Sequence, residues 1–179
     1  MMGSIARRYA RALFLLAEEQ GALEQTGIEL QQLAELAAAP EMAALVGNPL
    51  LSAKARRTVA VSLAEQLALS GTMKSFVCLL ADKHRLDQMV GIADAYRRML
   101  DEVRMRVRAV IHTAVELEEA EGEKIVEVFE RVTGKTVLAT KEVDKELLGG
   151  VVVELGGTVY DGSLKTQLAG LAASIAGSA

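Results

Sequence analysis

Apolar residues recur at intervals of three and four along the chain up to about residue 104. This spacing places side chains on one face of an α-helix, and it predicts six helices joined by short connections. Five of the expected stripes are Ile5, Tyr9, Leu13 and Leu16; Leu23, Leu30, Leu33 and Ala37; Val59, Leu63 and Leu67; Met73, Phe76, Val77 and Leu80; and Met89, Ala93, Tyr96, Leu100 and Val103. The third helix in chain order is a short one expected over "PEMAALVG", with Pro40 at its first position. No strand pattern precedes residue 104, so we expect a self-contained bundle.

Small polar residues and a glycine mark several of the expected helix ends. Ser4, Ser52 and Asp87 precede apolar stripes and are typical N-caps, because their side-chain oxygens can accept from free backbone N–H groups. Gly21 follows the first stripe and favours a left-handed C-terminal cap. Residues 48–49, Asn-Pro, interrupt the chain before the fourth helix, and Gly71 separates the fourth helix from the fifth.

The period of the pattern changes to two at "RMRVRAVIHTAV". Alternation predicts a strand with one buried face. The residues expected on that face are Met105, Val107, Ala109, Ile111 and Thr113.

An acidic helix is expected next, over residues 117–132, closed by Gly134 as its C-terminal cap. Its expected inward residues are Ile125, Val128, Phe129 and Val132. A second strand follows at about 136–143.

The glycine-rich stretch "GGVVVELGGTVYDGSLKT" predicts a hairpin. Residues 151–155 and 158–160 form its strands, and Gly156 and Gly157 form a two-residue turn that needs positive φ. The segment "DGS" at 161–163 then starts a last helix. The expected stripe of that helix is Leu164, Leu168, Leu171 and Ile175.

These patterns together predict a mainly α protein of two domains. A six-helix bundle occupies residues 1–104, and a small α+β domain occupies residues 105–179. The stretch between Asp101 and Arg108 contains no Gly or Pro, so a flexible hinge is not expected there.

Composition supports a globular protein and argues against several functions. Of 179 residues, 51% are hydrophobic and 25% charged, which excludes disorder, and no apolar run reaches the roughly 18 residues that span a bilayer. The chain has no Trp and few other aromatic residues, which argues against aromatic-lined ligand pockets and base-stacking platforms. The single Cys78 lies among apolar residues, where a buried, inert thiol is expected.

Charge is distributed unevenly. The net charge of −4 arises entirely after residue 104, mainly from glutamates between Glu116 and Glu130. These indicate either a solvated helix face or a surface for a basic partner. In the first helix, three arginines (Arg7, Arg8 and Arg11) precede Glu18 and Glu19, the reverse of the order that the helix dipole favours. This order suggests that the helix is kept for a partner.

No motif for catalysis, a metal or a cofactor emerges. The triplet Gly134-Lys135-Thr136 copies the end of a phosphate-binding loop, but Phe129 stands where that loop needs its first glycine, and the segment runs from helix to strand. The glycines after residue 148 do not match G-x-G-x-x-G. His84 and His112 have no second ligand at metal spacing.

Three segments resemble the delta subunit of F-type ATP synthases, the family called in mitochondria the oligomycin-sensitivity-conferring protein. They are "IARRYARALFLLAEEQGALE", "FVCLLADKHRLDQMVGIADAYRRML" and "LLGGVVVELGGTVYDGSLKTQLAGL". The resemblance covers essentially the whole chain. Its most specific part is the last segment, in which a Gly-Gly pair, a strand, a turn, a short strand and "DGSL" stand in the family's order.

The resemblance implies a non-catalytic stator connector of a proton-translocating ATP synthase, without substrate or cofactor. The connector would link the catalytic alpha/beta head to the membrane-anchored b subunits of the peripheral stalk. The six-helix domain would hold the amphipathic N-terminal helix of an alpha subunit in a groove between its first and fifth helices. Residues at the matching positions here are Tyr9, Ala12, Leu13, Phe76, Leu79 and Lys83. The C-terminal domain would meet the ends of the b subunits.

Two questions stay open at this point. Leu13 and Phe76 fit a bundle core as well as a groove, whereas Tyr9, Ala12 and Leu79 fit the groove better. Without the resemblance, the pattern fits a generic helical adaptor for an amphipathic partner helix, with an enzyme as a third interpretation.

The chain also lacks a transit-peptide pattern, which favours a bacterial protein attached indirectly at the cytoplasmic side of the plasma membrane.

Overall fold

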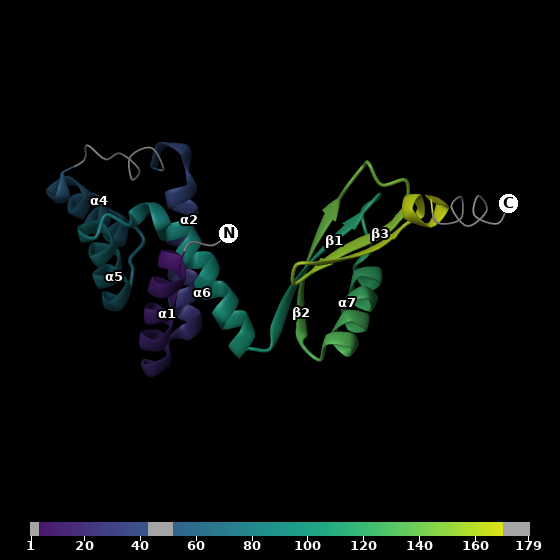
Figure 1. Cartoon of the computed structure of the whole chain (residues 1–179), viewed down its shortest axis with the longest axis horizontal. Helices are drawn as coiled ribbons and strands as arrows, with labels where there is room; N and C mark the ends of the chain where they lie inside the picture. The colour runs from purple at the N-terminus through teal and green to yellow at the C-terminus, as the bar shows by residue number, and fades with distance from the viewer. Residues whose placement is uncertain (1–3, 43–51, 170–179) are drawn as a thin grey trace. The chain divides into compact units, whose positions relative to one another are not determined.

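The computed structural model describes residues 4–42 and 52–169. It divides the chain into two compact units, Met1–Leu100 and Asp101–Ala179 (Figure 1). The described chain is mainly helical and contains a small sheet of four strands. This agrees with the mainly α class expected from the sequence.

The described part of the first unit is built from helices. They are α1 (Ser4–Glu19), α2 (Leu23–Ala38), α4 (Ala53–Gln66), α5 (Gly71–Asp82), the 3-10 turn η1 (Leu86–Gln88) and α6 (Met89–Val103). Residues 40–42 are also helical, beginning at Pro40, but the rest of the expected third helix and the 48–49 dipeptide lie outside the described residues. The six-helix count therefore stays a prediction.

Several expected helix ends are confirmed, and three differ. Ser4, expected as an N-cap, is already the first residue of α1. Gly21 has φ of 65°, and the N–H of Ala22 reaches the carbonyl of Ala17 at 2.9 Å, which is a Schellman cap. The Ser52 side chain accepts from the backbone of α4. The α5 cap is Ser70, because Gly71 is already helical. The prediction that Asp87 caps the sixth helix is wrong, because Asp87 lies inside η1, which continues directly into α6.

The core of the first unit forms where the apolar stripes of these helices meet. Tyr96 of α6 is 1% exposed, and its ring packs against Phe14 with centroids 5.3 Å apart. Its hydroxyl donates to the carbonyl of Leu23 at 2.9 Å, which satisfies the polar end of a buried side chain. Burial raises the pKa of Tyr96 to about 12. The stripes of α2, α5 and α6 thus face inward as expected, apart from Val103, which is exposed.

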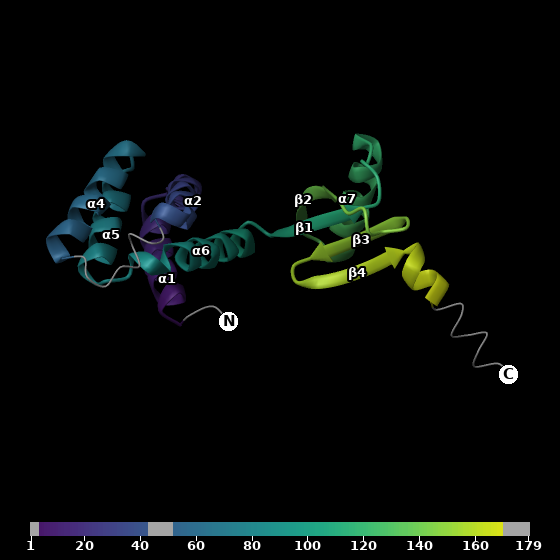
Figure 2. The same cartoon turned by 90° about the horizontal axis from the view of Figure 1, so that it is seen from above.

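The second unit combines a sheet with one long helix. Its elements are β1 (Arg106–Thr113), α7 (Glu119–Thr133), β2 (Thr136–Val143), β3 (Gly150–Leu155) and β4 (Thr158–Ser163). The strand order is β2-β1-β3-β4, with β1 parallel to β2 and the other neighbours antiparallel (Figure 2). A parallel pair needs a long crossover, which α7 supplies.

One face of this sheet packs against α7. The buried sheet residues are Ala109, Ile111, Val137, Val153 and Leu155, and the residues packed on them include Leu117, Ile125, Val126 and Phe129. Met105, expected inward, is 56% exposed because the strand begins only after it.

Two expected inward positions on α7 are wrong. Val128 is 52% exposed and Val132 is 72% exposed. A helix that lies on a single sheet buries only a narrow stripe, here the one through Ile125 and Phe129. The stripe with Val128 and Val132 lies to its side and is left uncovered by the described residues.

The glycine-rich stretch forms the expected hairpin. Gly156 and Gly157 have φ of 57° and 92°, as a tight turn between β3 and β4 requires. The returning strand continues to Ser163, three residues beyond the expected end. Residues 164–169 are helical, while Leu171 and Ile175 lie outside the described residues. Gly134, with φ of 66°, caps α7 as expected.

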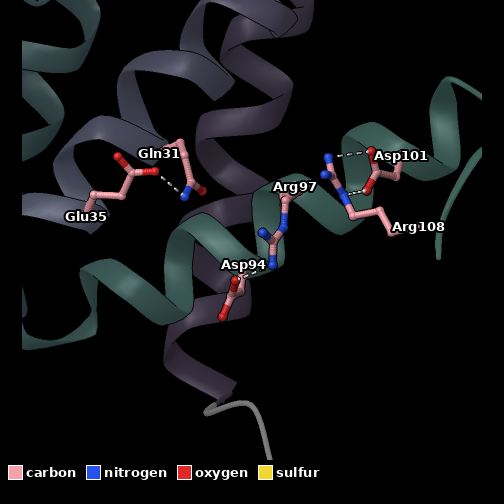
Figure 3. A network of polar contacts seen from close by, with 6 residues as sticks. All are labelled: Gln31, Glu35, Asp94, Arg97, Asp101 and Arg108. Carbon is pink, nitrogen blue, oxygen red and sulfur yellow. Dashed lines mark hydrogen bonds and ion pairs between the residues drawn. The ribbon is translucent and has the colours of Figure 1, made fainter. Parts of the chain in front are cut away.

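An ion pair ties the end of α6 to β1. Arg108 donates to both carboxylate oxygens of Asp101, at 2.7 and 3.3 Å (Figure 3). The division between the two units falls within the last turns of α6, just before Asp101. None of the helices in the described ranges combines the length and apolar character needed to cross a bilayer.

Candidate functional site

Helices α1 and α5 run in opposite directions beside one another. At one end, the Thr72 hydroxyl of α5 donates to the Gln20 side chain just after α1, at 3.0 Å. Farther along, the rings of Tyr9 and Phe76 meet edge to face with centroids 6.4 Å apart. The first turns of α1 therefore lie towards the C-terminal half of α5.

An apolar groove of about 470 Å³ lies between the two helices. Its walls are Tyr9, Ala12, Leu13 and Leu16 of α1 and Gly71, Thr72, Ser75, Phe76 and Leu79 of α5. Five of the six residues expected at a partner site are therefore brought together. The sixth, Lys83, does not line the groove and lies one turn beyond Leu79 as the C-terminal cap of α5.

Exposure separates the floor of the groove from its rims. Leu13 is 2% exposed and Phe76 is 8% exposed, and both belong to the bundle core. Leu79 and Leu16 are 44% and 41% exposed. Leu13 and Phe76 therefore belong to the core and also line the floor of the groove, while their role as partner contacts stays a prediction.

Sequence reasoning missed four of the residues that line the groove. Leu16 follows Leu13 by three residues and Ala12 by four, so the helical period could have placed it there. Gly71, Thr72 and Ser75 precede Leu79 on the same face of α5, but small polar residues give no apolar signal. Their small side chains leave space between the two helices at this end of the groove.

A buried carboxylate fixes where α5 begins. Glu29 of α2 is 6% exposed, and its carboxylate accepts from the Ser70 N–H at 3.1 Å and from the Ser70 hydroxyl at 2.7 Å. The same hydroxyl accepts from the Met73 N–H at 3.4 Å. Glu29 thus holds the N-terminal cap of α5 against α2 and positions one wall of the groove.

A second apolar hollow, of about 550 Å³, lies in the second unit between α7 and the β3–β4 hairpin. Its walls include Val128, Phe129, Val151 and Tyr160, and the rings of Phe129 and Tyr160 meet edge to face with centroids 5.2 Å apart. Val128 of the exposed stripe of α7 therefore lines this hollow.

Asp161 at the edge of this second hollow has a depressed pKa. Its carboxylate accepts from the Ser163 N–H at 2.8 Å and from the Thr166 hydroxyl at 2.7 Å. These hydrogen bonds favour the charged form and hold the pKa of Asp161 below its usual value. The Asp161 side chain is thus part of the link between β4 and the helical residues after it.

The α1–α5 groove is lined by apolar and small polar residues, and the second hollow adds Lys124 and Asp161 to an otherwise mainly apolar lining. Within the described ranges, no three His, Cys, Asp or Glu residues gather as a metal site would require. His84 shares a hydrogen bond with Arg56 at 2.8 Å, and His112 lies 3.6 Å from the Glu142 carboxylate. The α1–α5 groove and the hollow of the second unit both offer apolar side chains and small residues, which suit the binding of another helix.

Comparisons with known proteins agree with one another. The family model described as ATP synthase delta (OSCP) subunit matches residues 5–175. The ATP synthase subunit delta of Anaeromyxobacter sp. (strain Fw109-5) is 43% identical over 169 residues, covering 94% of each chain. That of Syntrophobacter fumaroxidans is 39% identical, covering 92% of this chain and 90% of the relative.

A solved structure matches the fold as well. It is a chain in the mitochondrial ATP synthase hexamer of Toxoplasma gondii, with a TM-score of 0.71. The match covers 97% of this chain and 98% of that chain at 18% identity, which shows the likeness of fold alone.

Proposed function

The chain belongs to the ATP synthase delta (OSCP) subunit family, and on that premise we propose that it holds an amphipathic helix of the catalytic head in the α1–α5 groove. Membership makes the protein a peripheral-stalk subunit of an F-type ATP synthase, a structural component and not a catalytic one. The helix proposed for the groove is the N-terminal helix of an alpha subunit.

The observation that carries this proposal is the groove itself. Two exposed leucines, Leu16 and Leu79, stand on its rims, and Ala12 leaves room between bulkier neighbours for another backbone to approach. A groove with apolar anchors and a small residue beside them is what an amphipathic helix needs in order to bury its apolar face. Tyr9 adds a hydroxyl that can stay in water while its ring is covered.

The energy available from this groove alone is moderate. Three or four large apolar side chains buried at about 1.5–3 kcal/mol each would give on the order of 5–10 kcal/mol before ordering costs are subtracted. A stator has to remain attached while the rotor applies torque, so slow dissociation is the property its function demands.

A second contact would lengthen the attachment. We infer that the second unit meets the C-terminal ends of the peripheral-stalk b subunits, with the apolar hollow between α7 and the β3–β4 hairpin as the surface suited to that contact. Two contacts within one assembly raise the effective concentration of each, so the joint attachment would outlast either one. Cutting the chain near residue 104 should therefore shorten its residence time on the complete enzyme.

The two domains and the cellular location of the protein follow from the same family membership as proposals. We propose that the N-terminal domain, residues 1–104, is completed as a six-helix bundle by a third helix that begins at Pro40. Residues 105–179 would then form the stalk-binding domain. The protein would sit at the cytoplasmic side of a bacterial plasma membrane, attached through its partners.

Calorimetric titration of the full-length protein with a peptide of the alpha subunit's N-terminal segment tests the groove. Saturable one-to-one binding is expected, and Tyr9→Ala and Leu79→Asp should each weaken it, because one removes an aromatic anchor and the other places a charge on the apolar rim. Ile28→Asp is the matched control, because Ile28 on α2 is 54% exposed and does not line the groove. Absence of binding by the unaltered protein would contradict the proposal and leave a helical adaptor with another partner.

A further inference from the structure

The charges on α1 fall at the two ends of the α1–α5 groove. Arg8 precedes Ala12 by one helical turn, and Glu19 follows Leu16 by one turn. Residues three or four apart share a helix face, so Arg8 borders one end of the groove and Glu19 borders the other. The reversed order of charges along α1 therefore places a basic group at one end of the groove and an acidic group at the other.

Helix α5 adds a second basic group at the Arg8 end. Lys83 follows Leu79 by one turn and ends α5. Because α5 runs opposite to α1, its C-terminal end lies towards the first turns of α1. The start of α6, which follows α5 through η1, is also near the first turns of α1, because a Cβ added to Gly91 would lie 3.3 Å from that of Ala6.

These three charged side chains are available to a partner. Arg8, Glu19 and Lys83 are exposed. Within the described ranges they take part in none of the side-chain ion pairs, unlike Arg57, which is bound to Asp82 at 2.8 Å. Asp82 also lies one turn beyond Leu79, but its charge is balanced by Arg57. The groove is therefore an apolar channel with two basic groups outside these ion pairs at one end and an acidic group at the other.

Helix dipoles do not select a direction for an occupant of this channel. The dipoles of α1 and α5 point in opposite directions, so their effects on a third helix between them largely cancel. The charged side chains at the ends are then what distinguishes one direction from the other, as complementary charges do when they fix the register of an interface.

We propose that the occupant of the groove lies parallel to α1, with acidic side chains of its first turn beside Arg8 and Lys83 and a basic side chain of its last turn beside Glu19. This inference rests on the proposed function, because it concerns the direction of the same partner helix. An amphipathic helix with acidic residues first and basic residues last also has the charge order that its own dipole favours, which would lower the cost of forming the helix on binding.

Paramagnetic broadening of NMR signals measures the direction in which the bound helix lies along the groove. The probe is the alpha subunit's N-terminal peptide with a nitroxide at its first or at its last residue, bound to full-length protein with labelled leucine methyl groups. Leu79 and Leu16 are exposed groove residues that lie towards opposite ends. A label on the first residue should broaden Leu79 more than Leu16, and a label on the last residue should do the reverse.

Charge reversal provides an independent readout. The pair Arg8→Glu and Lys83→Glu should weaken peptide binding about tenfold at low salt, and Glu19→Lys about threefold, with both effects shrinking as salt is added. The matched controls are Arg11→Glu with Lys74→Glu, and Glu18→Lys. They make the same charge changes on the same helices, about 100° or more around from the groove, and should leave binding unchanged.

The outcomes separate this inference from the function on which it rests. Binding with the opposite broadening pattern, or with both leucines broadened equally by each label, would overturn the direction and leave the groove function standing. Equal losses in the charge variants and their controls would do the same, because they would show a general charge effect. No binding of the unlabelled peptide would overturn the proposed function itself.

Discussion

The two units bury apolar surface in different ways, although the same helical period is present in both. In the first unit, α5 packs against several helices, including α1, α2 and α4, and Met73, Val77 and Leu80 are all fully buried. In the second unit, α7 rests on one sheet, and among its valines Val128 and Val132 are more than half exposed. A helical period therefore identifies which residues share a face, but the number of neighbours decides how wide the buried stripe is.

The two apolar hollows reflect the same difference. The α1–α5 groove has a floor of core residues, Leu13 and Phe76, that the folding of the bundle holds in place. The hollow of the second unit is bordered by Val128 and Tyr160, which are 52% and 44% exposed. We expect the first to be a preformed site and the second to depend more on what covers it.

Truncating buried and exposed leucines on one helix should give the largest contrast. Leu80→Ala should destabilise the protein by about 2–5 kcal/mol, because Leu80 is 0% exposed and its removal leaves a cavity. Leu79→Ala, one residue away and half exposed, should change stability by less than about 0.5 kcal/mol while weakening peptide binding. Urea denaturation followed by circular dichroism measures both. A large loss of stability in Leu79→Ala would mean that the groove rim is part of the core.

A buried and an exposed valine substitution in the second unit test whether its hollow is open. Val153→Ala removes a side chain that is 3% exposed, whereas Val128→Ala removes one from the uncovered stripe of α7. The first change should destabilise the unit and the second should change its stability by less than about 0.5 kcal/mol. Comparable losses would indicate that the hollow is filled in the folded protein, which would remove the difference between the two units.

Glycine substitutions in the second unit should show which turns are confined by packing. A Cβ on Gly150, whose φ is 85°, would lie 2.5 Å from the Gly162 carbonyl oxygen and 2.9 Å from the Cα of Ser163. Gly150→Ala should therefore cost about 2–4 kcal/mol, since neighbouring backbone has to move. Gly134→Ala, at φ of 66° with open space around it, should cost about 1 kcal/mol from backbone strain alone. Equal costs, measured by thermal unfolding, would contradict the close approach of β4 to Gly150.

Much of this architecture could be predicted from the sequence, and the failures have physical causes. Gly21, Gly134 and the pair Gly156 and Gly157 have positive φ, and their positions between the hydrophobic stripes identified these turns in the sequence. Asp87 failed as a cap because the chain enters α6 through a 3-10 turn, whose tighter hydrogen bonding leaves no role for that side chain in the cap.

The residues of the candidate site also divide into those that the sequence predicts and those that it does not. Tyr9, Ala12, Leu13, Phe76 and Leu79 could be placed from the helical period and a family resemblance, and all five line the groove. Thr72 and Ser75 could not, because polar residues carry no burial signal and their place depends on how α1 crosses α5. Ser70 as a cap was within reach of the usual rule for small polar residues before a helix.

High pH should affect the first unit through Tyr96. Its folded pKa of about 12 lies above the unfolded value near 10, so its contribution is fully present below pH 10 and is lost as pH rises towards 12. The loss should be about 2–3 kcal/mol for a shift of this size. Tyr96→Phe should lack this part of the pH dependence, although it loses the hydrogen bond to Leu23. The measurement is the free energy of unfolding in urea at pH 9 and 11.5, and parallel slopes for the two proteins would contradict the assignment.

Low pH should act on the second unit through Asp161, and this effect should be the smallest because the carboxylate is exposed. Its folded pKa is below the unfolded value, so its contribution is present above the unfolded pKa and is lost as pH falls through the folded one. The first consequence should be local, because the hydrogen bonds from Ser163 and Thr166 tie β4 to the helical residues 164–169. The protection of amides in 164–169, measured relative to the intrinsic exchange rate at each pH, should fall on acidification in the unaltered protein. Asp161→Asn, which cannot titrate, should show faster exchange already at neutral pH and no further acid-induced change. If both proteins responded alike, the acid response would belong to other carboxylates, and the opposite pH responses of the two units could no longer be ascribed to Tyr96 and Asp161.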